Sequence, residues 1–220
     1  MILHKNNLIA ISIVVTVMYA LIFFLIKDLG NMDKVLTLLI YNDPAVIGLF
    51  FVGLSIIMEK NQQVLSALFV TPVNHHIYLI SRILTLSILG WACALGMGLS
   101  ILGTSFYMLH FSVGVFGTCV LFSILGIIVV SYTTEFLLFL LKSIPVLIGL
   151  SLPLLNYFNL TDISLFYFTP LQGPLNLIIN SYAENPINSE LLYGYISTIF
   201  WIPVFYFFAF RIFKAKMINS

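Results

Sequence analysis

SVGVFGTCVLFSILGIIVV, from Ser112 to Val130, contains no charged residue and is close to the length of a membrane-spanning helix. An α-helix needs about 20 apolar residues to cross the hydrocarbon core of a bilayer. The whole chain has the same character: 61% of its 220 residues are hydrophobic and only 8% are charged, whereas soluble domains carry about 25% charged residues. The sequence therefore predicts an all-α, polytopic membrane protein, with one transmembrane domain over residues 1–220.

Five further apolar runs bring the predicted number of transmembrane helices to six. The second run is short, and we expect Asp43 to be its N-cap and Pro44 its first helical residue. The fifth run is also short and is interrupted by Pro145 and Pro153. The six expected spans cover residues 8–26, 44–58, 77–100, 112–130, 143–158 and 191–210.

The basic residues predict how the spans are oriented. If the N-terminus is cytoplasmic, Lys27 and Lys34 are the two of the nine basic residues that fall outside the cell. Basic residues in short loops set orientation, whereas acidic residues contribute little. We therefore expect a multi-pass protein of the cell (plasma) membrane with both termini in the cytoplasm.

Composition and missing motifs disfavour several functions. The net charge of +1 does not suggest nucleic acid as a partner, and the two cysteines lie within apolar runs. The sequence shows no nucleotide-binding motif and no cluster of metal ligands, so no cofactor or metal is expected. It also lacks the Gly-x-Ser-Gly pattern of an intramembrane serine protease. A stand-alone channel or secondary transporter is the alternative to the function inferred below, but the span centres are almost free of charge and offer no obvious ion-coupling site.

The connection between the expected second and third spans, Glu59 to His76, is amphipathic. Its polar face carries amides and a hydroxyl rather than lysines, so its attraction to anionic lipid is weak. Pro72 ends the helical pattern, and Asn74 can cap the next span. From the residues alone, an anchor in the membrane interface and a docking surface for another protein both remain open. The apolar side chains recur at helical spacing: Val64, Leu65, Leu68 and Phe69.

The stretch DPAVIGLFFVGLSIIMEKNQQVLSALFVTPVNHHIYLISRIL, Asp43 to Leu84, resembles the same region of ABC-2 type transporter permeases. In that family an apolar span is followed by an acidic–basic pair, a Thr-Pro, and then a Tyr-Leu and a basic residue that open the next span. Small permeases of the fluoroquinolone-export type are similar in length. The resemblance extends loosely to Tyr167–Leu177, but only the first stretch is specific. The matching residues are Glu59, Lys60, Thr71, Pro72, Tyr78, Leu79 and Arg82.

The resemblance implies a function. In ABC-2 exporters this connection is a coupling helix that docks on a separate ATPase subunit. The chain would then be the transmembrane permease subunit of an ATP-driven exporter, working in membrane lipid with a second copy of itself or a related permease. The aromatic, nearly uncharged interior suits apolar or amphipathic cargo. The residues expected to couple to the ATPase are Glu59, Lys60, Val64, Leu65, Leu68, Phe69, Thr71 and Pro72.

Other polar residues allow two interpretations. Glu59 has Lys60 or Arg82 as possible partners, although we expect Arg82 mainly to anchor its helix at the headgroups. Glu135 precedes FLLFLL, and we expect this hexad to lie along the interface with Glu135 at headgroup level. The outer segment Asn159–Glu190 mixes apolar runs with prolines, which fits either re-entrant helices that dip into the membrane or an external cap.

Overall fold

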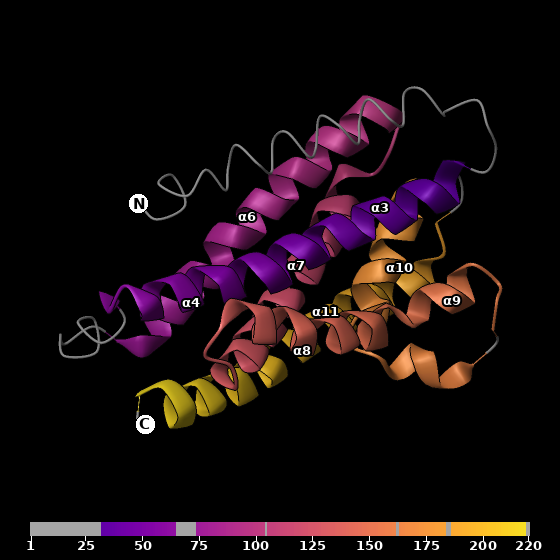
Figure 1. The fold of residues 1–220 in the computed structure, drawn as a ribbon. Coiled ribbons are helices and arrows are strands. Elements are labelled where there is room, and N and C mark those ends of the chain that lie inside the picture. The colour runs from indigo at the N-terminus through magenta and orange to yellow at the C-terminus, as the bar shows by residue number, and fades with distance from the viewer. Residues whose placement is uncertain (1–31, 65–73, 104, 162, 184–185, 219–220) are drawn as a thin grey trace.

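The computed structural model describes residues 32–64, 74–103, 105–161, 163–183 and 186–218, and every secondary-structure element in these ranges is a helix (Figure 1). This confirms the all-α prediction. The expected first span, 8–26, lies outside the described residues, so the count of six stays a prediction. Five described stretches are long and apolar enough to cross a membrane: Lys34–Asn61, His75–Leu102, Met108–Ser131, Phe136–Tyr157 and Asn188–Met217.

The first of these stretches begins well before Pro44, so the expectation of a short span capped by Asp43 is wrong. Pro44 lies inside the helix. A proline removes one helical hydrogen bond and crowds the preceding turn, and a π-helical turn follows it directly and accommodates the distortion. The apolar residues before Asp43 continue the helix because Leu36, Ile40 and Tyr41 pack in the core. The consecutive elements are α3 (Met32–Val46), η1 (Ile47–Phe51) and α4 (Val52–Asn61).

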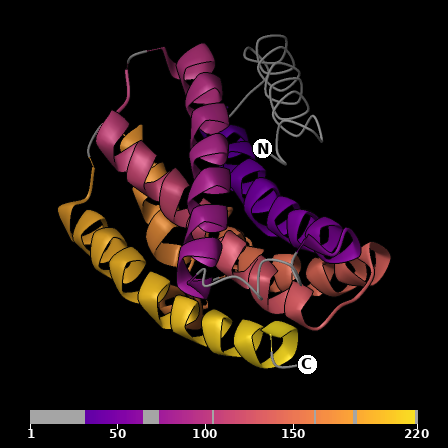
Figure 2. The ribbon, with the colours of Figure 1, turned by 90° about the vertical axis from the view of Figure 1, so that its left-hand side faces the viewer.

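Helix α7 (Met108–Ser131) lies at the centre of the bundle, and its neighbours surround it (Figures 1 and 2). It packs against α6 (His75–Leu102) and against the first described span. Three of its glycines each face a different neighbour: Gly114 contacts α10, Gly117 faces Thr198 of α11, and Gly126 faces the backbone of Leu49. These glycines let α7 pack closely against its neighbours within one subunit.

Helix α8 (Phe136–Ser151) and the short α9 (Pro153–Tyr157) form the next stretch. The FLLFLL hexad makes the first turns of α8, so the helix of the expected fifth span begins earlier than residue 143. That the hexad lies along the membrane interface stays a prediction. Glu135 occupies the N-cap position and is exposed. The helix starts here because the chain turns after Ser131 and then meets an unbroken apolar run.

The segment between α9 and the last span contains two helices. The 3₁₀ helix η2 (Ser164–Phe168) buries none of its residues, whereas α10 (Gln172–Ser181) is buried except for Ile179. Helix α10 packs between α7 and α11 (Asn188–Phe213), which continues into the π-helical η3 (Lys214–Ile218). That α10 lies at membrane depth, as a re-entrant helix would, stays a prediction.

Labelling of single cysteines tests the position of α10. Leu175 and Ile178 are fully buried, whereas Phe168 of η2 is 78% exposed. We expect spin labels at Leu175 and Ile178 to show little access to a water-soluble relaxation agent, because protein surrounds both sites. A label at Phe168 is the matched control outside α10. Full water exposure of both α10 labels would contradict the buried, re-entrant placement.

Candidate coupling site

The described chain borders the expected coupling segment on both sides. Helix α4 ends at Asn61, and Gln63 adopts a left-handed backbone conformation with φ of 57°. On the other side, the Asn74 side chain accepts a hydrogen bond of 2.9 Å from the backbone N–H of His76. The N-cap predicted for this span is therefore confirmed. Its side-chain oxygen satisfies one of the free N–H groups at the start of α6.

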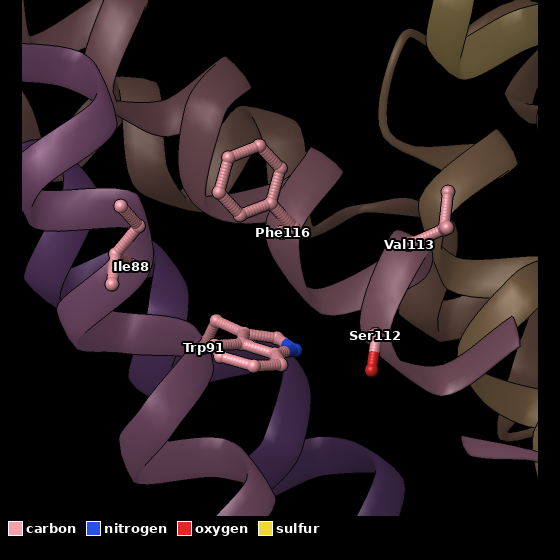
Figure 3. A pocket seen from close by; sticks show the side chains of 5 residues that line it. All are labelled: Ile88, Trp91, Ser112, Val113 and Phe116. Atoms are coloured by element: carbon pink, nitrogen blue, oxygen red, sulfur yellow. The ribbon is translucent and has the colours of Figure 1, made fainter. Parts of the chain in front are cut away.

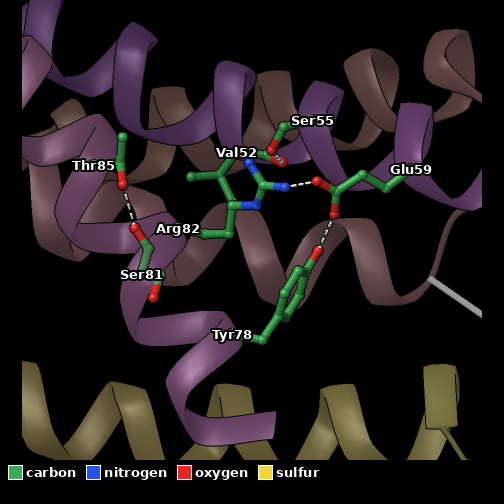
Figure 4. Close-up of polar contacts among 7 residues, drawn as sticks. All are labelled: Val52, Ser55, Glu59, Tyr78, Ser81, Arg82 and Thr85. Atoms are coloured by element: carbon green, nitrogen blue, oxygen red, sulfur yellow. Dashed lines mark hydrogen bonds and ion pairs between the residues drawn. The ribbon is translucent and has the colours of Figure 1, made fainter. Parts of the chain in front are cut away.

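A buried ionic cluster joins these two helix ends (Figure 4). Glu59, in the last turn of α4, is only 1% exposed. One carboxylate oxygen forms an ion pair with the Arg82 guanidinium of α6, and the Tyr78 hydroxyl donates a hydrogen bond of 2.5 Å to the other. The same guanidinium lies 5.6 Å from the centre of the Tyr78 ring. Each member of the cluster thus contacts both of the others.

The ion pair and the hydrogen bond of this cluster make it energetically costly to separate α4 from α6. Removing a carboxylate from water is costly, and only a well-placed opposite charge together with hydrogen bonds offsets the cost. Arg82 and Tyr78 supply both to Glu59. If α4 and α6 separated at this level, a charge would be left buried without its partner. The cluster therefore holds together the two helix ends that border the expected coupling segment.

Aromatic contacts extend this connection to the end of α11. The His76 ring stacks on Phe210 with ring centres 3.6 Å apart, and one of its nitrogens lies 3.0 Å from the Tyr206 hydroxyl. The Tyr78 ring packs on Phe213 with centres 6.1 Å apart. A movement of the start of α6 would therefore also act on α11.

The structure describes only three of the eight residues in the expected coupling set. Glu59 and Lys60 lie in the last turn of α4, and Val64 is exposed. The preference for Arg82 as a headgroup anchor is wrong, because its guanidinium pairs with Glu59. The roles of all eight residues in coupling stay predictions. Five of them lie outside the described residues: Leu65, Leu68, Phe69, Thr71 and Pro72.

Sequence reasoning gave no site role to the Tyr78 hydroxyl or the His76 ring. Tyr78 lies four residues before Arg82, so both side chains project from one face of α6. That spacing, next to a lone acidic residue at the end of the preceding span, was a usable signal. The contact of His76 with α11 had no such signal, because it depends on how distant helices pack.

Two apolar pockets lie on the membrane-spanning part of α6 and α7. The first lies between these helices and is lined by Ile88, Trp91, Ser112, Val113 and Phe116 (Figure 3). The second extends from Phe116 to Tyr206 and Pro203 of α11. Hydroxyl groups and the Trp91 indole N–H are the polar side-chain groups in their walls, so both pockets suit apolar groups.

Comparison with known proteins identifies the family. The model of the fluoroquinolones export permease protein family matches residues 2–220. The chain belongs to this family. It is also similar to the fluoroquinolones export permease proteins of two Mycobacterium tuberculosis strains, CDC 1551 / Oshkosh and ATCC 25618 / H37Rv. Each is 28% identical to it over 139 residues.

These matches cover 62% of this chain and 58% of each relative, so the chain aligns with little more than half the length of its curated relatives. No solved structure gives a significant match. Membership of the export permease family, together with the five apolar helices, confirms the predicted multi-pass membrane protein. It also confirms the resemblance to small permeases of the fluoroquinolone-export type.

Proposed function

We propose that this chain is the transmembrane subunit of an ATP-driven ABC exporter. We further propose that the segment after the turn at Gln62 and Gln63, residues 64–70, forms its coupling helix, docked on a separate ATPase. The observation that carries the proposal is the Glu59–Arg82–Tyr78 cluster. It closes the base of the connection that, in ABC-2 permeases, receives the movement of the ATPase. A segment fixed in this way moves α4 and α6 together rather than bending at its own ends.

The cytoplasmic side, in this proposal, is the one at which α4 ends and α6 begins. Basic residues gather there: Lys60 lies in the last turn of α4, and Lys142 donates a hydrogen bond of 3.0 Å to the carbonyl of Tyr132. Lys216 lies 5.7 Å from the ring of that same tyrosine, so the end of α11 reaches this surface as well. Basic residues favour the cytoplasmic side, which agrees with the N-in, C-in orientation.

The proposed cargo is an apolar or amphipathic molecule, carried by two permease subunits that are identical or related. Family membership supports export, and the names of the relatives specify fluoroquinolones for those proteins. The two apolar pockets beside Phe116 offer surfaces on which a molecule of this kind can pack from within the bilayer.

Replacing Leu68 and Phe69 together by glutamate tests the proposal. Full burial of each side chain against the ATPase contributes about 1.5–3 kcal/mol to the free energy of binding. Two charges in their place should therefore abolish binding to the ATPase. The membrane spans do not depend on this surface and should still insert. The measurement is recovery of the ATPase with the affinity-purified permease, alongside the amount of permease in the membrane fraction.

Gln62→Glu/Ser66→Glu is the matched control, because it adds the same charge to polar residues of the same connection. We expect this variant to retain the ATPase. Normal recovery of the ATPase with the Leu68/Phe69 variant would contradict the coupling-helix proposal and favour an interfacial anchor. If the wild-type permease recovers no ATPase, the stand-alone transporter becomes the better explanation.

A further inference from the structure

Asp43 is a carboxylate inside a membrane-spanning helix. The structure places it within the stretch Lys34–Asn61, and its side chain is only 9% exposed. The expectation that it caps a helix at the membrane surface is wrong for this reason. The related expectation of nearly uncharged span centres also needs correction, because Asp43 puts an ionisable group inside a span.

The position of Asp43 along the helix indicates its depth. With a rise of about 1.5 Å per residue, Asp43 lies roughly 14 Å from Lys34, and the 28-residue stretch is about 42 Å long. A hydrocarbon core of about 30 Å centred on this stretch begins roughly 6 Å from either end. Asp43 is then about 7–8 Å inside the core. Ionisable residues at such depth are costly, and they commonly mark a pathway or binding site.

Helices α6 and α7, which both pack against α3, are apolar at the level of Asp43. Ile47, one turn further along the chain, lies opposite Gly90 of α6, where an added Cβ would be 3.6 Å from the Ile47 side chain. Because α3 and α6 run antiparallel, Asp43 is level with Ala94, one turn beyond Gly90. On α7, Gly48 lies against Cys119, which places Asp43, five residues earlier, level with Gly114 and the adjoining Val115. Ala94 and Val115 are both fully buried.

Asp43 has no hydrogen-bond or ion-pair partner among the described residues. The cationic side chains of the described spans lie near span ends, as Lys34 and Lys60 do, and Arg82 is already paired with Glu59. Pro44 adds a second acceptor near Asp43: it has no N–H for the carbonyl oxygen of Ile40, which precedes it by one turn. Within the described part of the chain, the arrangement thus presents oxygen acceptors in an apolar setting without a matching cation.

We propose that Asp43 binds the ammonium group of a cationic amphiphile within the bilayer, with the apolar body of that molecule against the neighbouring span surfaces. The inference rests on the proposed export function, for which it names the cargo class: protonated amines with an apolar body. An ammonium group donates charge-assisted hydrogen bonds to a carboxylate. The surrounding apolar walls strengthen this attraction, because little water competes for either charge.

A matched pair of probes tests this proposal without any ATPase. Purified permease in nanodiscs of zwitterionic lipid is titrated with 1-naphthylmethylamine and with its neutral N-acetyl derivative, and binding is measured by equilibrium dialysis. We expect the wild type to prefer the amine by about 10- to 100-fold, the range for a hydrogen bond to a charged group. Asp43→Asn should lose the preference and keep its affinity for the acetylated probe, whereas Asp43→Glu should retain much of the preference.

Glu135→Gln is the control for general surface charge, because Glu135 is an exposed carboxylate outside the spans. This variant should prefer the amine as the wild type does. Equal affinity of the wild type for both probes, or an unchanged preference in Asp43→Asn, would overturn the proposal. Neither result bears on the coupling segment, which the ATPase recovery tests separately.

A second measurement uses the wild type alone, in case Asp43→Asn does not fold. Dicyclohexylcarbodiimide modifies carboxyl groups in apolar surroundings, and mass spectrometry of the peptide that contains Asp43 reports the extent. The amine should protect Asp43, and the acetylated probe should not. Equal modification with and without the amine would refute binding at this residue.

Discussion

Arg82→Met should lower the free energy of unfolding by about 3–5 kcal/mol, the usual cost of removing one partner from a buried ion pair. The substitution leaves the Glu59 carboxylate at 1% exposure, with the Tyr78 hydroxyl as its one remaining side-chain partner among the described residues. Reversible unfolding in mixed micelles, followed by tryptophan fluorescence, measures the change. Arg211→Met is the control, because this arginine is exposed and its guanidinium lies 5.5 Å from the centre of the Phe207 ring. It should shift stability by no more than about 0.5 kcal/mol.

The double variant Glu59→Met/Arg82→Met separates the stability of the cluster from its function. Apolar side chains of similar volume can replace a buried ion pair with little loss of stability, so this variant should fold nearly as well as the wild type. Glu59→Gln, which keeps a hydrogen-bond acceptor for Tyr78, should assemble with the ATPase but transport more weakly. If the double variant is as unstable as Arg82→Met alone, the loss does not come from an unpaired charge.

The cluster also shows where sequence reasoning succeeded and where it stopped. An acidic residue ending one apolar run and a basic residue opening the next predicted the neighbourhood of the site, because consecutive spans joined by a short connection lie side by side. The sequence could not choose between Lys60 and Arg82 as the partner of Glu59. That choice depends on the rotation of each helix about its axis, which is set by packing with α7 and α11.

Asp43 and Pro44 led to a wrong helix boundary for a different reason. Asp-Pro is a strong local signal for a helix start. The structure overrides it because Leu36 and Ile40, before such a break, and Leu49, after it, bury their side chains in the same core. Where tertiary packing is extensive, it outweighs a local preference of a few kcal/mol. The apolar run from Val35 to Tyr41 was the signal that the helix extends further towards the N-terminus.

The π-helical turn that follows Pro44 could not be predicted from the sequence either. Its close packing on α7 predicts a large loss of stability when the glycines at this contact are replaced. The backbone carbonyl of Leu49, in the middle of η1, lies where a Cβ on Gly126 would approach it to 2.6 Å. Gly48 of η1 packs equally closely on α7, because a Cβ added to it would lie 2.6 Å from the carbonyl oxygen of Cys119. Backbone atoms cannot swing aside as a flexible side chain can, so any larger residue forces η1 and α7 apart.

Gly126→Ala should therefore lower stability by about 1–3 kcal/mol, the typical cost of overpacking, and Gly126→Leu should leave little folded permease. Gly149 of α8 is the matched position, because an added Cβ there meets nothing within 4 Å. Alanine at Gly149 should stabilise by up to about 1 kcal/mol through its higher helix propensity, and leucine should also be tolerated there. Unfolding in micelles and recovery of monodisperse protein measure both series. Equal tolerance of leucine at the two positions would mean that η1 and α7 do not pack backbone to backbone.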